Sequence, residues 1–121
     1  MEVFNFVVRS VPKCLEYLMD KVSLTPDDYD VLALHQANLF MVRQVAKKMK
    51  FPMEKVPTTI QKYGNSSSAT IPVTLASELH ELISSKRLKV LASGFGAGLS
   101  LASVSMDLGP CHCPGVVEYE C

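Results

Sequence analysis

The sequence has no excess of charge of either sign and no hydrophobic run of membrane-spanning length. Its 12 basic and 12 acidic side chains cancel, so no overall electrostatic field would attract nucleic acid or an anionic membrane surface. No apolar run approaches the roughly 20 residues that a bilayer-spanning helix needs. Residues 1–6 also lack the basic and apolar regions of a signal peptide. We therefore expect a cytoplasmic protein that binds neither nucleic acid nor membrane.

Cysteine is scarce over most of the chain, which argues against a disulfide framework. Cys14 lies in a helical pattern, whereas Cys111, Cys113 and Cys121 crowd the C-terminal tail. Small disulfide scaffolds spread their bridges over the whole sequence, so we expect reduced thiols. A zinc site in the tail is an alternative, but its cysteines are spaced more closely than in zinc fingers and ribbons, and we predict no metal. Cys14, beside the apolar stripe of its helix, is expected to be a small buried hydrophobe.

The chain does contain enough apolar material for one compact core. Hydrophobic residues make up 48% of the 121 positions, which suits a single domain; we assign it to residues 1–108 and treat 109–121 as a tail. Apolar spacing predicts helices over 4–22, 39–49 and 69–84, and strands over 31–34, 56–60, 89–93 and 99–108. The order helix, strand, helix, strand, helix, strand, strand predicts an α/β fold with a mixed, mostly parallel sheet and helices on its faces. Pro12 is expected to kink or split the first helix.

Two polar side chains stand near the ends of predicted strands. His35 directly follows the buried strand 31–34, and Asn65 lies in the loop between strand 56–60 and the next helix. Taken alone, each has an ordinary explanation, since a histidine can cap a strand and Gly-Asn is common in turns. Presented from neighbouring loops at one sheet edge, the two could donate hydrogen bonds to a single carbonyl oxygen. Together they predict an oxyanion site.

A glycine-rich turn, 94–98, is expected to join the last two strands. Glycine lets the backbone approach a ligand without an intervening side chain, so this turn could add amide donors beside the same site. Its spacing does not match the dinucleotide-binding pattern. A dinucleotide site is therefore not indicated.

Three motifs carry a resemblance to a known family. His-Gln-Ala-Asn at 35–38, Tyr-Gly-Asn-Ser-Ser-Ser-Ala at 63–69 and Gly-Phe-Gly-Ala-Gly-Leu-Ser at 94–100 resemble, in order and spacing, the C-terminal motifs of type III ketoacyl-acyl-carrier-protein synthases. The resemblance extends from residue 2 to about residue 108. It implies half of a thiolase-like fold and an acyltransferase that joins an acyl thioester to malonyl carrier protein with loss of carbon dioxide. It implies no cofactor, because coenzyme A or the phosphopantetheine of acyl carrier protein carries the acyl and malonyl groups.

The resemblance also implies roles for individual residues. His35 and Asn65 would donate hydrogen bonds to the malonyl thioester oxygen and so stabilise the enolate formed by decarboxylation, each contributing about 3–4 kcal/mol. The loop of Gly94, Phe95 and Gly96 would hold the acyl group and complete a second oxyanion site. Asn38 would hold the loop or the pantetheine arm.

The implied partners are acyl carrier protein and the other half of the enzyme. Family members carry their nucleophilic cysteine in an N-terminal half that is missing here, so we expect this chain alone to be inactive. Many relatives have a basic residue where Phe40 stands; Arg43, Lys47 and Lys48 are the alternative carrier-protein contacts, unless they form an ordinary solvated helix face. An isolated half would expose an apolar face, which predicts a homodimer.

The sequence is also compatible with other functions. One is a non-catalytic thiolase-like module that binds acyl groups or pantetheine without chemistry. Another is a related synthase of polyketides, hydroxymethylglutaryl thioesters or olefinic hydrocarbons, and a third is a small zinc-dependent interaction domain built on the tail. The sequence does not name the acyl primer.

Overall fold

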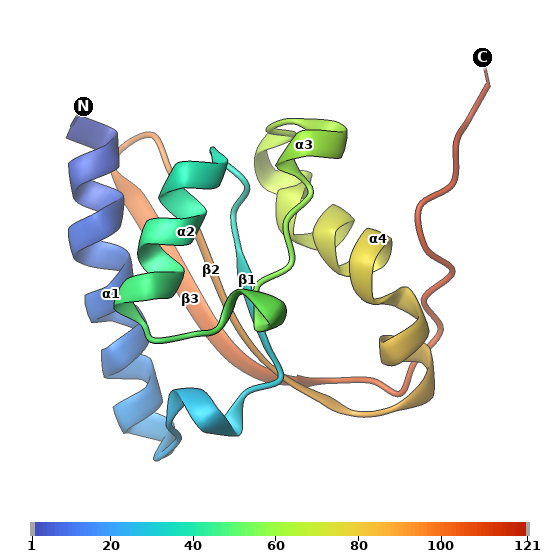
Figure 1. Ribbon diagram of the computed structural model, residues 1–121, viewed down its shortest axis with the longest axis horizontal. Coiled ribbons are helices and arrows are strands. Elements are labelled where there is room, and N and C mark those ends of the chain that lie inside the picture. The colour runs from blue at the N-terminus through green and yellow to red at the C-terminus, as the bar shows by residue number, and fades with distance from the viewer. Residues whose placement is uncertain (1, 121) are drawn as a thin grey trace.

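The computed structural model describes residues 2–120 and places one sheet between two helical layers (Figure 1). The helices are α1 (Glu2–Val22), α2 (Leu39–Lys48), α3 (Ile60–Tyr63) and α4 (Thr70–Ser85), and the strands are β1 (Val31–Leu34), β2 (Leu88–Gly96) and β3 (Ser100–Leu108). Short 3₁₀ turns occupy Pro26–Asp28, Met53–Lys55 and Ser67–Ala69. Helices α1 and α2 cover one face of the sheet, and α4 covers the other. The α/β class is confirmed.

The sheet has the order β1-β2-β3, with one parallel and one antiparallel pair. Leu34 of β1 stands beside Ser93 of β2, and Gly96 of β2 faces Ser100 of β3 across the hairpin. The sheet is therefore mixed as predicted, but it is not mostly parallel. One strand fewer than expected accounts for the difference.

The predicted strand over 56–60 is wrong. Val56–Thr59 pair with no strand in the described structure, and helix α3 begins at Ile60. Two features explain this: Pro57 has no backbone donor, and the Thr59 N–H donates to the side-chain oxygen Oε1 of Gln36 at 3.0 Å. A buried side chain thus satisfies the donor that a neighbouring strand would otherwise take.

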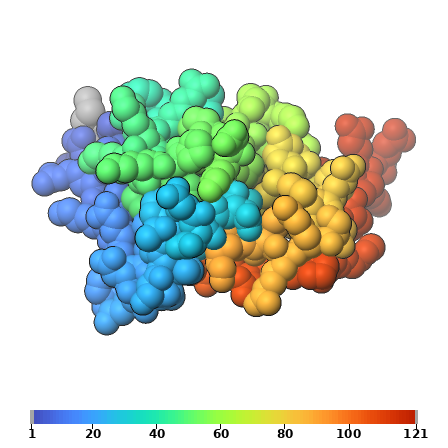
Figure 2. Space-filling view, turned by 60° about the horizontal axis from the view of Figure 1, so that its bottom comes forward, coloured from blue at the N-terminus to red at the C-terminus, as the bar shows by residue number. Residues whose placement is uncertain are grey.

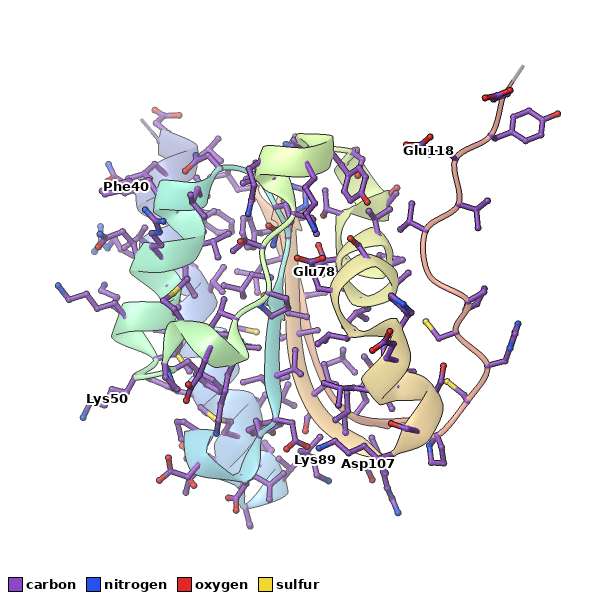
Figure 3. The ribbon with its side chains drawn as sticks, turned by 45° about the vertical axis from the view of Figure 1, so that its right-hand side comes forward. Phe40, Lys50, Glu78, Lys89, Asp107 and Glu118 are labelled. Carbon is purple, nitrogen blue, oxygen red and sulfur yellow. The ribbon has the colours of Figure 1, made fainter. Side chains whose placement is uncertain are left out.

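The strand 31–34 is buried on both faces, as its unbroken apolar run predicts. Leu32 and Leu34 pack with Leu91 and Phe95 against α1 and α2. On the opposite face Val31, Ala33, Val90 and Ala92 pack against Ile83 of α4 and its neighbours. Figure 3 shows the side chains of both layers filling the space on either side of the sheet. Each fully buried aliphatic side chain contributes about 1.5–3 kcal/mol, so β1 anchors both layers.

Helix α1 is amphipathic as predicted, and Pro12 does not split it. A proline cannot donate to the carbonyl four residues earlier, which here is that of Val8. The ammonium group of Lys48 on α2 donates to that Val8 oxygen at 3.1 Å. The helix therefore continues through the buried Pro12. Lys48 of the neighbouring helix replaces the donor that proline cannot supply to the Val8 carbonyl.

This contact predicts a measurable coupling between Lys48 and Pro12. Lys48→Met should lower the free energy of unfolding by about 0.5–1 kcal/mol, because it leaves the Val8 carbonyl without a protein donor. In a Pro12→Ala background the loss should shrink, since residue 12 regains an N–H for that carbonyl. Urea denaturation of the four chains measures the coupling, and Lys47→Met on the same exposed turn is the matched control. Equal losses in both backgrounds would refute the interpretation.

Two ion pairs lie at the hairpin end farthest from His35. Lys89 Nζ lies 2.6 Å from Asp107 Oδ1, and Arg87 also pairs with Asp107 (Figure 3). The hydrogen bonds from Lys89 and then Arg87 lower the pKa of Asp107 below its usual value of 3.8. Exposed pairs of this kind add little stability. Lys89 and Asp107 are directly opposite in the β2–β3 register, so this pair joins the two strands.

The tail runs back along α4 (Figures 1 and 2). The Cys111 N–H donates to the Ile83 oxygen at 3.0 Å, and Cys113 packs against the α4 side of the sheet. Within residues 2–120 no three histidine, cysteine, aspartate or glutamate side chains lie together as a metal site would require; Cys121, part of the zinc alternative, lies outside the described residues. Cys14 is half-buried, which is less enclosed than expected. No helix of the described chain combines the length and apolarity needed to cross a membrane.

Candidate active site

His35 follows the last residue of β1 and is fixed on three sides. Its backbone N–H donates to the Ser93 oxygen at 3.0 Å, which extends the parallel pairing by one residue. Its ring nitrogen Nδ1 lies 2.5 Å from the hydroxyl oxygen of Thr70. The ring also meets the ring of Phe95 edge-on, with centroids 5.3 Å apart. Partial burial lowers the pKa of His35 below 6.5, so the imidazole is neutral at pH 7.

The neutral state of His35 predicts a pH-dependent contribution to stability. With a folded-state pKa below 6.5, the unfolded chain binds more protons than the folded chain between the two pKa values. The free energy of unfolding should therefore fall as pH drops through 6.5, and this contribution should level off below the folded-state pKa.

Urea denaturation between pH 8 and pH 5 measures the effect as a difference between the native chain and His35→Asn. Asparagine does not titrate, so the difference in free energy of unfolding in favour of the native chain should decrease as the pH is lowered. His112→Asn, in the exposed tail, is the matched control for replacing a histidine by asparagine. A native advantage that grows as pH falls would contradict the lowered pKa.

Asn65 lies in a loop in which the preceding residue, Gly64, has a backbone conformation that only glycine adopts readily. Gly64 has φ +67° and ψ −160°, a combination essentially restricted to glycine. No atom lies within 4 Å of a Cβ built there, so the constraint is conformational and not one of space. The Asn65 oxygen Oδ1 accepts a hydrogen bond from the Ser67 N–H at 2.9 Å. With Oδ1 engaged, the side-chain NH₂ group is the part of Asn65 left to donate to a ligand.

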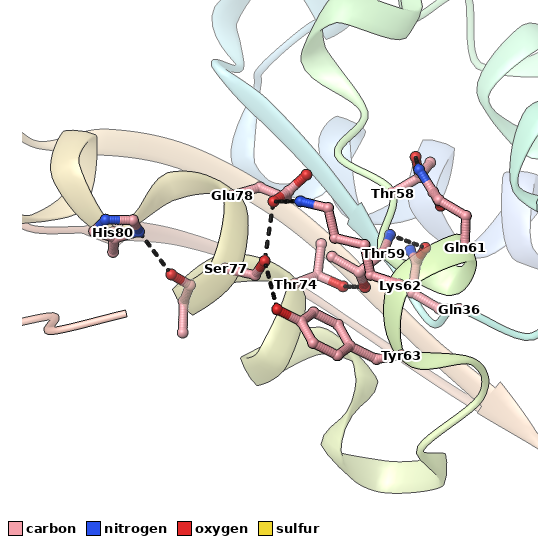
Figure 4. A network of polar contacts seen from close by, with 11 residues as sticks. Gln36, Thr58, Thr59, Gln61, Lys62, Tyr63, Thr74, Ser77, Glu78 and His80 are labelled. Atoms are coloured by element: carbon pink, nitrogen blue, oxygen red, sulfur yellow. Dashed lines mark hydrogen bonds and ion pairs between the residues drawn. The ribbon is translucent and has the colours of Figure 1, made fainter. Parts of the chain in front are cut away.

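A polar network holds the segment before Asn65 against α4 (Figure 4). Lys62 Nζ lies 3.0 Å from Glu78 Oε2, and the Tyr63 hydroxyl lies 3.3 Å from that of Ser77. Deeper in, the hydroxyls of Thr59 and Thr74 are 2.7 Å apart. These contacts bring α3 and α4 together, so the loop between them is fixed at both ends.

The expected glycine loop is largely part of a strand, which corrects the prediction for Gly94, Phe95 and Gly96. All three belong to β2 and pair with β3, and only 97–99 form the turn. Successive strand residues point to opposite faces, so Phe95 joins the α1–α2 core while both glycines face the α4 side. A Cβ on Gly96 would meet no atom within 4 Å, and one on Gly94 only Ile71 at 3.9 Å. The missing side chains leave open space beside α4.

The structure brings most of the predicted residues together around one open pocket of about 700 Å³. His35, Asn65, Gly94, Phe95 and Gly96 all line it. Further lining comes from Ser67, Ser68, Thr70, Ile71, Ala97, Ser100, Leu101 and Ala102. None of these lining residues, all within the described 2–120, is a cysteine, so a nucleophilic thiol would have to come from outside this set. The pocket offers a neutral imidazole and an amide as hydrogen-bond donors, which suits a developing oxyanion.

The other predicted residues lie away from this pocket. The Asn38 side chain caps α2 by accepting from the Met41 N–H at 2.8 Å, the usual duty of asparagine before a helix. Arg43, Lys47 and Lys48 are exposed on α2, and Lys48 also bonds to α1. Their part in carrier-protein docking stays a prediction.

Sequence reasoning missed Thr70. A threonine at the start of a predicted helix is ordinary, and its partner His35 is 35 positions away in the chain. No local pattern marks such a contact, so only the packing of α4 beside β1 could reveal it.

Comparison with known proteins decides the family. The model of the family described as 3-oxoacyl-[acyl-carrier-protein (ACP)] synthase III C terminal matches residues 19–108. The chain belongs to this family. A beta-ketoacyl-[acyl-carrier-protein] synthase III of Prochlorococcus marinus is 43% identical over 112 residues, which cover 89% of this chain and 32% of that protein.

Solved structures of synthases share the fold. The crystal structure of a 3-oxoacyl-(acyl-carrier protein) synthase from Burkholderia xenovorans matches with a TM-score of 0.93 at 39% identity, over 98% of this chain and 34% of that one. A priming beta-ketosynthase of a polyketide pathway matches with a TM-score of 0.75 at 28% identity, over 88% and 32%. This synthase III family chain thus spans about a third of the length of the relatives it matches. The fold is that of their C-terminal part.

Proposed function

We propose that this chain supplies one wall of the condensation site of a 3-oxoacyl-acyl-carrier-protein synthase III. The observation that carries the proposal is the convergence of His35, Asn65 and the glycine strand on one pocket in a member of this family. The reaction joins an acyl thioester to malonyl carrier protein with loss of carbon dioxide. The acyl and malonyl groups would arrive on coenzyme A or on the phosphopantetheine of acyl carrier protein.

In the proposed step, the bond between the malonyl methylene carbon and its carboxylate breaks. Carbon dioxide leaves, and the electron pair moves onto the thioester oxygen to form an enolate. The neutral His35 ring and the Asn65 amide donate hydrogen bonds to that oxygen as its charge develops, each lowering the barrier by about 3–4 kcal/mol. The enolate carbon then attacks the acyl thioester, and the cysteine that carried the acyl group leaves as thiolate.

The nucleophilic cysteine would be supplied by the N-terminal part of the synthase. None of the pocket-lining residues is a cysteine, and Cys14 lies on α1, away from them. The chain alone should therefore catalyse no condensation. We expect another part of the synthase or a second copy to cover some of the exposed apolar side chains, which include Leu82, Leu99 and Val104.

A chimera tests the function directly. This chain replaces the matching third of the Burkholderia xenovorans synthase, and the products of acetyl-coenzyme A and malonyl carrier protein are measured by mass spectrometry. The controls are the shortened Burkholderia protein and this chain, each alone. Condensation by the chimera only would support the proposal. A folded chimera that takes up the acyl group yet neither decarboxylates nor condenses would favour a non-catalytic acyl-binding module.

The acyl primer is a separate question, and the likeness to a polyketide-priming ketosynthase favours testing a second class of product. Competing the chimera with short, branched and longer acyl-coenzyme A primers would separate fatty acid initiation from polyketide priming. Both reactions use the same enolate step, so the roles of His35 and Asn65 do not depend on the result.

A further inference from the structure

Three buried threonines form a hydrogen-bonded path that ends at His35. Thr59, Thr70 and Thr74 are 2%, 2% and 0% exposed. The Thr74 hydroxyl donates to the Thr70 backbone oxygen at 2.7 Å. Its single proton is thereby used, so in the 2.7 Å contact between the Thr59 and Thr74 hydroxyls Thr59 is the donor.

The direction of the hydrogen bond made by the Thr70 hydroxyl follows in the same way, from the acceptors within reach of its proton. It lies 2.5 Å from His35 Nδ1, and among the contacts within residues 2–120 no other acceptor for its proton is found. If Nδ1 carried a proton and donated it, the Thr70 proton would be left without a protein acceptor, which costs free energy. The arrangement that satisfies both groups has Thr70 donating to an unprotonated Nδ1.

We propose that Thr70 is a positioning residue that holds His35 in the tautomer protonated on Nε2. With Nδ1 engaged by Thr70 and the ring edge against Phe95, Nε2–H is the donor that remains for a ligand in the pocket. This inference deepens the proposed function, because the enolate step needs a protonated nitrogen facing the substrate. Thr70 acts through His35 and touches no reacting atom.

Nitrogen NMR of the full chain labelled at histidine tests the tautomer without any activity. The native chain at pH 7.5 should show His35 with an unprotonated Nδ1 and a protonated Nε2, whereas the exposed His112 should show averaged tautomers. His35 is the only histidine and the only acidic or basic side chain among the pocket-lining residues, so its titration is not confused by a charged neighbour in that set. A native His35 protonated on Nδ1 would overturn the proposal.

Two substitutions sharpen the test through the sign of a pKa change. Thr70→Val removes a bond that favours neutral His35, so the pKa of His35 should rise; if Nδ1 were instead the donor, the same change would lower the pKa or leave it unaltered. Thr70→Ser keeps the hydroxyl and should behave like the native chain. A His35 pKa that falls or stays the same in Thr70→Val would overturn the proposal.

In the chimera, Thr70→Val should reduce the rate of decarboxylation about tenfold or more, as expected when the tautomer of a catalytic histidine is no longer fixed by a hydrogen bond. Thr70→Ser should keep the native rate. Full activity in Thr70→Val would count against the positioning role. The spectra and the activity separate the two proposals: an Nε2–H tautomer in a chimera without activity supports the assignment of Thr70 while contradicting the proposed function.

Discussion

His35→Ala and Asn65→Ala should each lower malonyl thioester decarboxylation by the chimera by about 10²–10³-fold. Removing one preorganised donor from an oxyanion site typically has an effect of this size. In the proposed mechanism both donors serve one oxygen, so the double variant should lose less than the product of the two single losses. The measurement is release of carbon dioxide in a single turnover with excess enzyme.

Matched controls keep this result interpretable. His112→Ala changes an exposed tail histidine and Asn5→Ala an exposed residue of α1, so neither should alter the rate by more than about twofold. Circular dichroism and urea denaturation check that the variants remain folded. Decarboxylation that survives in both His35→Ala and Asn65→Ala would remove the two residues from the mechanism, whatever the overall activity of the chimera.

Gln36→Leu should lower the free energy of unfolding by about 2–4 kcal/mol. Gln36 is fully buried, donates to the Leu34 oxygen at 2.7 Å and accepts from the Thr59 N–H. Leucine has a similar volume but satisfies neither group, and each buried polar group left unpaired costs about 1–3 kcal/mol. The loss should appear in urea denaturation as a lower midpoint with an unchanged slope.

Gln61→Leu is the matched control, because Gln61 makes an exposed contact to Thr58 and its loss should cost less than about 0.5 kcal/mol. Gln36→Leu should also loosen the segment around Thr59, which precedes the loop of Asn65. Faster amide exchange at Thr59 in Gln36→Leu would show this. If the two leucine variants were equally stable, the bridging role of Gln36 would be wrong.

Local patterns in the sequence were sufficient for much of this fold. Helical spacing identified α1, α2 and α4, and an unbroken apolar run identified β1, because burial on one helical stripe or on both faces of a strand restricts side chains within a short window. The motifs at 35–38, 63–69 and 94–100 also placed His35, Asn65 and the glycines at one site. The family match over residues 19–108 confirms the resemblance they carried.

Contacts between distant residues decided the rest. The segment 56–60 has strand-like composition, yet Gln36 takes the Thr59 donor and no strand forms. Gly94 and Gly96 looked like a turn but pair with Ala102 and Ser100, because a partner strand can hold glycine in an extended conformation that it does not prefer by itself.

By itself, then, the sequence determined which segments are amphipathic and which side chains could supply chemistry, because those properties depend on neighbours within a turn or a strand. Only the tertiary structure decided the hydrogen-bond partners: Lys48 for the carbonyl that Pro12 leaves vacant, Gln36 for Thr59, and Thr70 for His35. Buried polar groups must be paired. Which group pairs with which depends on how α4, β1 and α2 pack, and no local pattern encodes that.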